Sequence, residues 1–294
     1  MLGDIRRGLS EGRVIPYIGP GLLQLVPGGS PVPASPEVLV QMMVSKVSVP
    51  HKVRNNLTAA AQFIENFKHR KTVAAMMTEA FQPDVTPSAL HRYLAALPLK
   101  PLLIVDVWYD NAMETALREH AERQRSIAAR PIEYWGQIQG VSQAEHFGTW
   151  TQGFSEDGTL VEGGEMETWS TILYKPLGSI SPAKNYLVSD SDYVEVLTEI
   201  DIQTPIPPLV QTLRSGAGFL FLGCRFRNQL ERTFARQVMK RSSDQHWAVL
   251  PGELTRNEER FLTEQNIKRL DLPLEDFAAS LIGGEALESL ALAG

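Results

Sequence analysis

Cysteine is nearly absent from this sequence, and the histidines are few and scattered. Cys224 is the only cysteine in 294 residues. An internal disulfide is therefore excluded. A thiolate-based zinc site is excluded too, because it needs three or four thiolates, or thiolates combined with paired histidines. The six histidines stand singly, without the short spacing typical of metal ligands. We therefore expect no zinc and no other bound metal.

Long apolar runs and clusters of basic residues are also missing. No stretch approaches the roughly 20 apolar residues of a membrane span, and residues 1–13 lack the apolar core of a secretory signal. The net charge is −6, and basic residues gather only in pairs such as Arg6-Arg7. Binding to nucleic-acid phosphates needs denser clusters of Lys and Arg. We therefore expect a cytoplasmic protein that binds neither nucleic acid nor membrane.

Apolar, β-prone segments alternate with helical segments along the chain. Strands are predicted at residues 14–18, 102–107, 171–175, 218–222, 247–250 and 267–270. Helical patterns fill most of 36–79 and cover 112–125, 192–198, 228–241, 256–265 and 274–282, and Thr86-Pro87 predicts the start of a helix that ends near Leu97. The alternation predicts one Rossmann-like α/β domain, with a doubly wound, mainly parallel sheet of about six strands and helices on both faces. Residues 131–164, rich in aromatics and glycine, predict a small irregular insertion or subdomain.

The segment VIPYIGPGLL, residues 14–23, is the most informative motif. An apolar strand runs directly into Gly19-Pro20-Gly21 and Leu22. At such a junction, phosphates can approach backbone amides without meeting a Cβ atom. The third glycine of the dehydrogenase fingerprint is missing, so a tight turn explains the same residues. Other segments must decide between these two interpretations.

Four segments together resemble the sirtuin-like NAD-binding family, in its bacterial branch of NAD-hydrolysing domains. Residues 14–23 resemble the family's strand and Gly-Ala-Gly turn, with Pro20 in place of alanine. Residues 91–117 resemble the run that ends in Thr-Thr-Asn-Tyr-Asp, of which Tyr109-Asp110 remain. YKPLGSI, residues 174–180, resembles the strand ending in His-Gly-Ser and is followed by the Asp192-Tyr193 helix start. FLGCRFRN, residues 221–228, resembles the turn beside the adenosine ribose.

This resemblance implies a site for NAD or ADP-ribose and excludes the zinc-containing deacetylases, which carry four cysteines. The cofactor-binding positions that it implies are Gly19, Pro20, Gly21, Leu22, Asp110, Gly178, Ser179, Gly223 and Arg225. Some of these have simpler explanations as well. Asp110 either receives the nicotinamide amide or caps a helix, and Arg225 either meets phosphate or ribose or is a solvated turn residue.

Two departures from the family pattern bear on catalysis. Trp108 stands at the position of the Asn that orients ribose hydroxyls and water, and Leu177 stands at the position of the general-base His. An indole has one donor and leucine has no polar atom, whereas a general base is worth about 10²–10⁴-fold in rate. Trp108 either stacks on a ligand ring or plugs the emptied site, and we favour the plug. We therefore favour a degraded NAD- or ADP-ribose-binding domain over an active NAD hydrolase.

Three other side chains are weaker candidates for a chemical role. His91 is expected in the core, Cys224 is expected to act as a small hydrophobe, and His146, in the insertion, is a weak candidate for the missing base. None of the three is expected to carry catalysis.

The active alternative is an NAD glycohydrolase of a bacterial antiphage defence system, with a site completed by another subunit. The degraded domain is instead expected to act through a homo-oligomer or a protein partner. Residues 286–293, ALESLALA, form a short amphipathic stretch that we expect to dock on a second copy or a partner. Folding back on the chain's own core is the simpler alternative.

Overall fold

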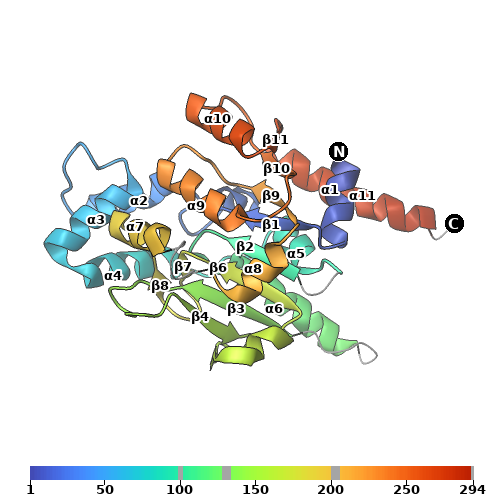
Figure 1. Cartoon of the computed structure of the whole chain (residues 1–294), viewed down its shortest axis with the longest axis horizontal. Coiled ribbons are helices and arrows are strands. Elements are labelled where there is room, and N and C mark those ends of the chain that lie inside the picture. Colours follow the sequence, from blue (N-terminus) through green and yellow to red (C-terminus); the bar gives the residue numbers. More distant parts are fainter. Residues whose placement is uncertain (99–101, 128–133, 200–205, 293–294) are drawn as a thin grey trace.

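A nine-stranded sheet forms the centre of the protein (Figure 1). The computed structural model describes residues 1–98, 102–127, 134–199 and 206–292, without the side chains of residues 163, 199 and 284–292. The strand order is β11-β10-β9-β1-β2-β6-β3-β4-β5. The strands are β1 Val14–Ile18, β2 Leu102–Asp106, β3 Trp135–Gly140, β4 Thr151–Ser155, β5 Leu160–Val161, β6 Thr171–Lys175, β9 Gly218–Leu222, β10 His246–Val249 and β11 Ile267–Leu270.

The sheet is parallel from β11 to β3, and only β4 and β5 add antiparallel pairs at one edge. All five residues of each of β1, β2, β6 and β9 are buried, as expected for strands that are covered on both faces. The fold class predicted from the alternating segments is therefore confirmed, but the described sheet has nine strands instead of the predicted six or so.

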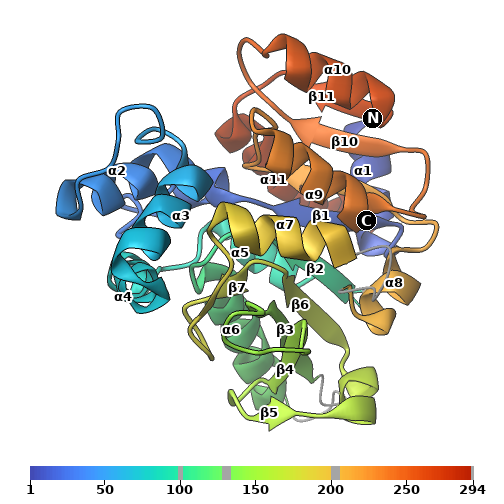
Figure 2. The same ribbon diagram turned by 60° about the vertical axis from the view of Figure 1, so that its left-hand side comes forward.

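Helices cover both faces of the sheet, and each face has its own core (Figure 2). Alternate strand residues point to opposite sides: Ile15 belongs to one core and Val14 to the other. The first core includes residues of α2 Pro36–Lys46, α3 Leu57–Lys68, α4 Arg70–Phe81, α7 Asp190–Glu199, α8 Pro208–Arg214, α9 Gln229–Met239 and α10 Arg256–Glu264. The second includes residues of α1 Leu2–Ser10, α5 Ala89–Ala95, α6 Ala112–Ser126 and α11 Leu274–Leu292.

The start of α5 differs from the expectation at Thr86-Pro87. The helix begins at Ala89, because Ser88 is its N-cap. The Ser88 hydroxyl accepts the His91 N–H at 3.4 Å, and the Ser88 N–H donates to His91 Nδ1 at 3.2 Å. The true cap therefore lies two residues beyond the predicted one.

The described part of residues 131–164 continues the central sheet. β3 pairs in parallel with β6, and β4 pairs with β3 in antiparallel orientation, so these strands are part of the main sheet. Gly136 and Gly140 are needed there, since a Cβ atom would lie 2.2 Å from the Trp169 ring and 2.0 Å from the Pro176 carbonyl oxygen, respectively. The short hairpin of β7 Gly178–Ser179 and β8 Asn185–Tyr186 and the helix α8 were not predicted.

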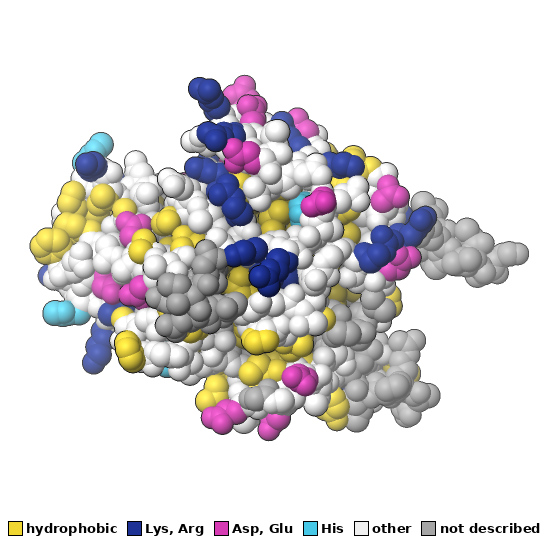
Figure 3. Space-filling model, viewed as in Figure 1, with side chains coloured by type: hydrophobic (Ala, Val, Ile, Leu, Met, Phe, Trp, Pro, Cys, Tyr) yellow, Lys and Arg dark blue, Asp and Glu magenta, His cyan; other side chains and the backbone are white. Residues whose placement is uncertain are grey.

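The surface carries charges of both signs, which are interspersed on the face shown in Figure 3. Phe67 of α3 is 68% exposed and packs on Phe63 with 4.4 Å between ring centroids. Within the described residues, no helix combines the length and the apolar character that crossing a membrane requires.

Candidate functional site

A cavity of about 740 Å³ opens at the carboxyl ends of the parallel strands. Its lining comes from residues at or just beyond the ends of β1, β2, β6, β9 and β10, and from α2, α7 and α9. In open α/β sheets this edge is where ligands bind, near the point at which the strand order reverses. Here β1 pairs with β2 on one side and with β9 on the other, which creates such a reversal.

The glycine turn forms part of the cavity wall through Pro20 and Gly21. Its amides, however, are used inside the protein: Gly19 N donates to the Leu222 carbonyl at 2.9 Å, and Gly21 N donates to the Gly223 carbonyl at 2.8 Å. Leu22 N donates to the Gly19 carbonyl at 3.0 Å, and proline has no N–H. The Gly19 and Gly21 amides thus hold the glycine turn to the end of β9 and the residue after it, and the Leu22 amide closes the turn itself.

The glycines are required by this loop contact. A Cβ atom on Gly21 would lie 2.8 Å from the Gly223 carbonyl oxygen, and Gly223 itself adopts a φ of 66°. Gly223 also lines the cavity, whereas Gly19 and Leu22 are buried and are not among its lining residues. The tight-turn interpretation explains these residues without a ligand.

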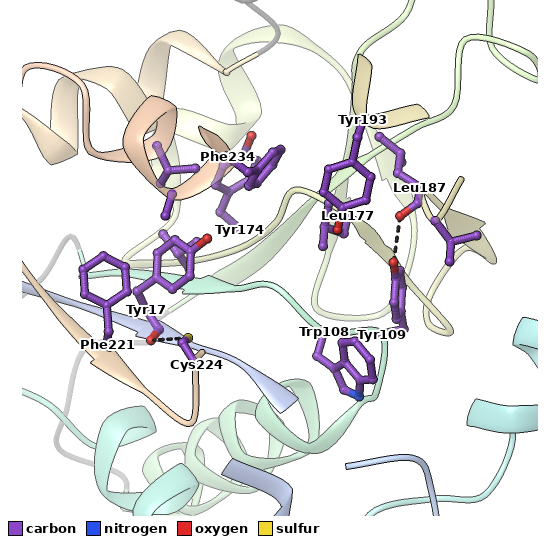
Figure 4. Packing of buried hydrophobic residues seen from close by; sticks show 14 of the residues in the cluster. Tyr17, Trp108, Tyr109, Tyr174, Leu177, Leu187, Tyr193, Phe221, Cys224 and Phe234 are labelled. Carbon is purple, nitrogen blue, oxygen red and sulfur yellow. Dashed lines mark hydrogen bonds between the residues drawn. The ribbon is translucent and has the colours of Figure 1, made fainter. Parts of the chain in front are cut away.

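Trp108 and Leu177, which occupy the positions of the Asn and the His in the family pattern, both line the cavity. Trp108 lies beside Tyr109, and Leu177 lies near Tyr193 (Figure 4). Both are buried, at 4% and 6% exposure. The Trp108 ring packs edge-on against Phe81 at 5.7 Å and tilted against Tyr109 at 5.2 Å. Its only donor, Nε1, is hydrogen-bonded to the Pro33 carbonyl at 2.7 Å. This part of the wall therefore offers a ligand no free hydrogen-bonding side-chain atom.

Asp110, Gly178 and Ser179 are buried and are not among the residues that line the cavity. The Asp110 carboxylate accepts the Ala112 N–H at 2.8 Å. Asn111 is the N-cap of α6, so this bond holds the turn just before the helix and Asp110 is not its N-cap. Gly178 has a φ of 82° and sits where a Cβ atom would be 2.1 Å from the Asn185 carbonyl oxygen. The family resemblance implied a ligand contact for Gly178 and Ser179, and for Asp110 either a ligand contact or a helix cap. The contacts that these residues make in the structure are internal.

A buried ion pair that the sequence did not indicate holds the backbone of Trp108 in place. Lys175 Nζ lies 2.5 Å from Asp106 Oδ2 and donates to the Asp110 carbonyl at 2.9 Å. The other Asp106 oxygen accepts the Trp108 N–H at 3.0 Å. Burial raises the pKa of Asp106 above its ordinary value, and the Lys175 charge opposes that rise. The pair ties the ends of β2 and β6 together.

Arg225 lines the cavity, but Glu258 holds its guanidinium. Arg225 Nε lies 2.8 Å from Glu258 Oε1, and Nη2 lies 3.1 Å from Oε2. Burial would raise the pKa of Glu258, but hydrogen bonds from Arg225 and Thr255 lower it to about 2. The Arg225 charge is therefore already balanced by a fully buried carboxylate.

Glu231 is a cavity residue that sequence reasoning did not single out. It lies in the first turn of α9, where its Oε2 accepts the Asn228 N–H at 3.3 Å. The pattern Asn228-x-x-Glu231 is that of a capping box, which accounts for the glutamate without any site. Burial raises its pKa to about 7. Only the folded arrangement reveals that this carboxyl faces a cavity.

The remaining candidates have no direct role in the cavity chemistry. His91 is buried, its Nδ1 lies 2.7 Å from the Ser88 hydroxyl, and burial lowers its pKa to about 4, so it is a neutral core residue. His146 does not line the cavity. Cys224 does, but burial raises the pKa of its thiol well above the ordinary value, which disfavours the nucleophilic thiolate. Within the described residues, no cluster of three or more His, Cys, Asp or Glu side chains could hold a metal ion.

A family model described as SIR2-like domain matches residues 102–270, which is more than half of the chain. The matched region contains Trp108, Leu177, Arg225 and Glu231 but not the glycine turn at residues 14–23. No curated protein sequence matches the chain.

Proposed function

The chain belongs to the SIR2-like domain family, and from this premise we propose that it binds NAD or ADP-ribose in the cavity without cleaving NAD efficiently. The family makes an NAD-related ligand the first expectation. The cavity volume of about 740 Å³ is in the range typical of small-molecule sites. Its position at the carboxyl edge of a parallel sheet is the position where dinucleotides bind in such folds.

The observation that carries the proposal of a degraded site is the pair formed by Trp108 and Leu177. Cleavage of the nicotinamide–ribose bond passes through an oxocarbenium-like state, which polar groups and a base at the ribose would help to form. Trp108 has its single donor bonded to Pro33, and Leu177 has no polar side-chain atom. Loss of a general base alone costs about 10²–10⁴-fold in rate.

The glycine turn limits how a diphosphate can be held. The described amides from Gly19 to Leu22 donate to backbone carbonyls within the protein, so the phosphates of a bound ligand must find other donors. Arg227 is the more adaptable of the two cations at the cavity, since its pair with Glu37 is 3.7 Å long and both side chains are more than half exposed. We propose that Arg227 turns toward the diphosphate.

Action through assembly remains part of the proposal. A domain that binds a nucleotide without turning it over would work by presenting its surface to a second copy or a partner. The expected docking segment, residues 286–293, lies outside the described side chains. The backbone of α11 is helical as far as Leu292.

Calorimetric titration with NAD and with ADP-ribose tests the binding, and chromatography of the same samples detects nicotinamide. We expect both ligands to bind and nicotinamide to stay at the level of the protein-free control. Gln24→Glu adds a negative charge at a cavity-lining, exposed position and should weaken binding by about fivefold, as expected for an exposed charge. Gln82→Glu, the same change at an exposed position outside the cavity, is the matched control.

Two outcomes contradict the proposal. If neither ligand binds, the chain has lost the family's nucleotide function. If nicotinamide accumulates, the chain is an active hydrolase, which is the alternative associated with antiphage defence and a site completed by another subunit.

A further inference from the structure

Glu231 differs from the other charged residues of the cavity in that only one of its two carboxylate oxygens has a hydrogen-bond partner among the described residues. Oε2 accepts the Asn228 N–H, whereas Oε1 has no hydrogen-bond partner among the described residues. The side chain is only partly exposed, and it lines the cavity. A polar oxygen in this position is available to a ligand.

No cation is paired with Glu231 in the described part of the chain. Arg225 is bonded to both oxygens of Glu258. Arg232, one residue along α9, donates from Nη1 to the Phe226 carbonyl at 2.6 Å and to the Arg227 carbonyl at 2.7 Å. An ionised Glu231 would therefore face an incoming anion without a neutralising partner.

The groups around Glu231 mostly favour its neutral form. Burial is the main cause, while the hydrogen bond from Asn228 opposes it. The titratable and charged groups that act on Glu231, or on which it acts, come from six elements: Tyr17 at β1, Glu37 on α2, Tyr193 on α7, Cys224 after β9, Arg232 on α9 and Glu258 on α10. Only Arg232 among them is cationic. A second negative charge in this space is costly unless a proton is taken up.

We propose that Glu231 is a ligand contact of the cavity that binds a diphosphate-containing nucleotide in its neutral, protonated form, so that binding takes up a proton. A protonated carboxyl donates one hydrogen bond, which a phosphate or sugar oxygen can accept. An ionised carboxylate only accepts and would repel the diphosphate. This inference rests on the proposed function and adds a residue and a charge state to it.

The size of the effect follows from a pKa of about 7 for Glu231 in the free protein. If only the protonated form binds, the apparent Kd rises with pH by about twofold at pH ~7 and about 11-fold at pH ~8, relative to the acidic limit. Proton uptake is then about half a proton at pH ~7 and about 0.9 at pH ~8. The described residues lining the cavity include no histidine, and His91 and His246 have pKa values of about 4, so these side chains do not imitate the effect.

Calorimetric titration of the full chain with ADP-ribose at pH ~7, in two buffers of different ionisation enthalpy, measures proton uptake directly. Glu231→Gln keeps an oxygen that can accept the Asn228 N–H and an amide that can donate to the ligand, but it cannot titrate. Glu195→Gln is the matched control, because Glu195 has a pKa raised by burial and lies outside the cavity.

We expect the wild type and Glu195→Gln to take up about half a proton and Glu231→Gln to take up none. The affinity of Glu231→Gln should also be flat between pH ~6 and ~8, where the wild type weakens by about tenfold. Equal proton uptake in Glu231→Gln and wild type, or a flat pH profile of the wild type, overturns the inference while leaving nucleotide binding intact. Absence of ADP-ribose binding by the wild type overturns the proposed function and, with it, this inference.

Discussion

Replacing Lys175 with methionine removes the cation that neutralises Asp106 below the cavity. Both side chains are almost completely buried, at 1% and 4% exposure. The substitution leaves a buried carboxylate with the Trp108 N–H as its remaining bond and deprives the Asp110 carbonyl of a donor. Removal of one partner of a buried pair costs about 3–5 kcal/mol, so we expect a loss of this size in the free energy of unfolding.

Urea unfolding at pH ~7, followed by tryptophan fluorescence, measures this loss. The matched control is Lys46→Met, which breaks the exposed Lys46–Glu79 pair and should cost less than about 1 kcal/mol. Adding Asp106→Asn to Lys175→Met should recover most of the stability, because no unpaired buried charge remains. A loss in Lys175→Met no larger than in Lys46→Met refutes the reasoning.

The Lys175→Met substitution should also change how the free energy of unfolding depends on pH. Burial already raises the pKa of Asp106 in the folded protein, and loss of Lys175 raises it further. A carboxyl with a folded pKa above its unfolded value of about 3.9 binds its proton more tightly in the folded state. The free energy of unfolding of Lys175→Met therefore falls as the pH rises from about 3.9 toward the raised pKa of Asp106 in the folded protein. Its deficit against wild type should be smaller at pH ~5 than at pH ~8.

Two further predictions concern catalysis and assembly. Trp108→Asn with Leu177→His should raise nicotinamide release by up to about 10²–10⁴-fold, while each single change does little because such groups act as a unit. Chromatography of the reaction measures this, and a folded double variant that binds NAD and stays inert contradicts the placement of the ribose. Truncation after Gly284 should lower the mass measured by light scattering to that of a monomer. Equal, monomeric masses for the full-length and truncated chains contradict the proposed assembly.

The sequence predicts the parallel part of the sheet well because its strands are continuous apolar runs. The bounds of β1 and β9 match the prediction residue for residue. β3 gives no such signal: its sequence, WGQIQG, buries Gln137 and Gln139, whose amides both donate to the Ser181 carbonyl, at 2.8 and 2.7 Å. Because β3 is held by partners 44 and 42 residues further along the chain, its own sequence shows no strand pattern.

The candidate site could be predicted only in part, for a similar reason. Several of the residues singled out in the sequence do meet at one cavity, because each follows a parallel strand and these strand ends share one edge of the sheet. They are Pro20, Gly21, Trp108, Leu177, Gly223 and Arg225. Asp110 and Ser179 make internal contacts instead: the Asp110 carboxylate accepts the Ala112 N–H, and the Ser179 hydroxyl lies 3.5 Å from the Asp110 carbonyl oxygen. The sequence does not indicate a site role for Glu231, because its place in the Asn228-x-x-Glu231 capping box already explains the residue.

We propose that this chain binds NAD and leaves it intact. Proton NMR of one sample that contains NAD and the full chain tests both halves, since saturation transfer reports binding and new nicotinamide resonances report cleavage. We expect saturation transfer to NAD, with nicotinamide no higher than in the protein-free control. Absence of transfer, or steady accumulation of nicotinamide, would contradict it.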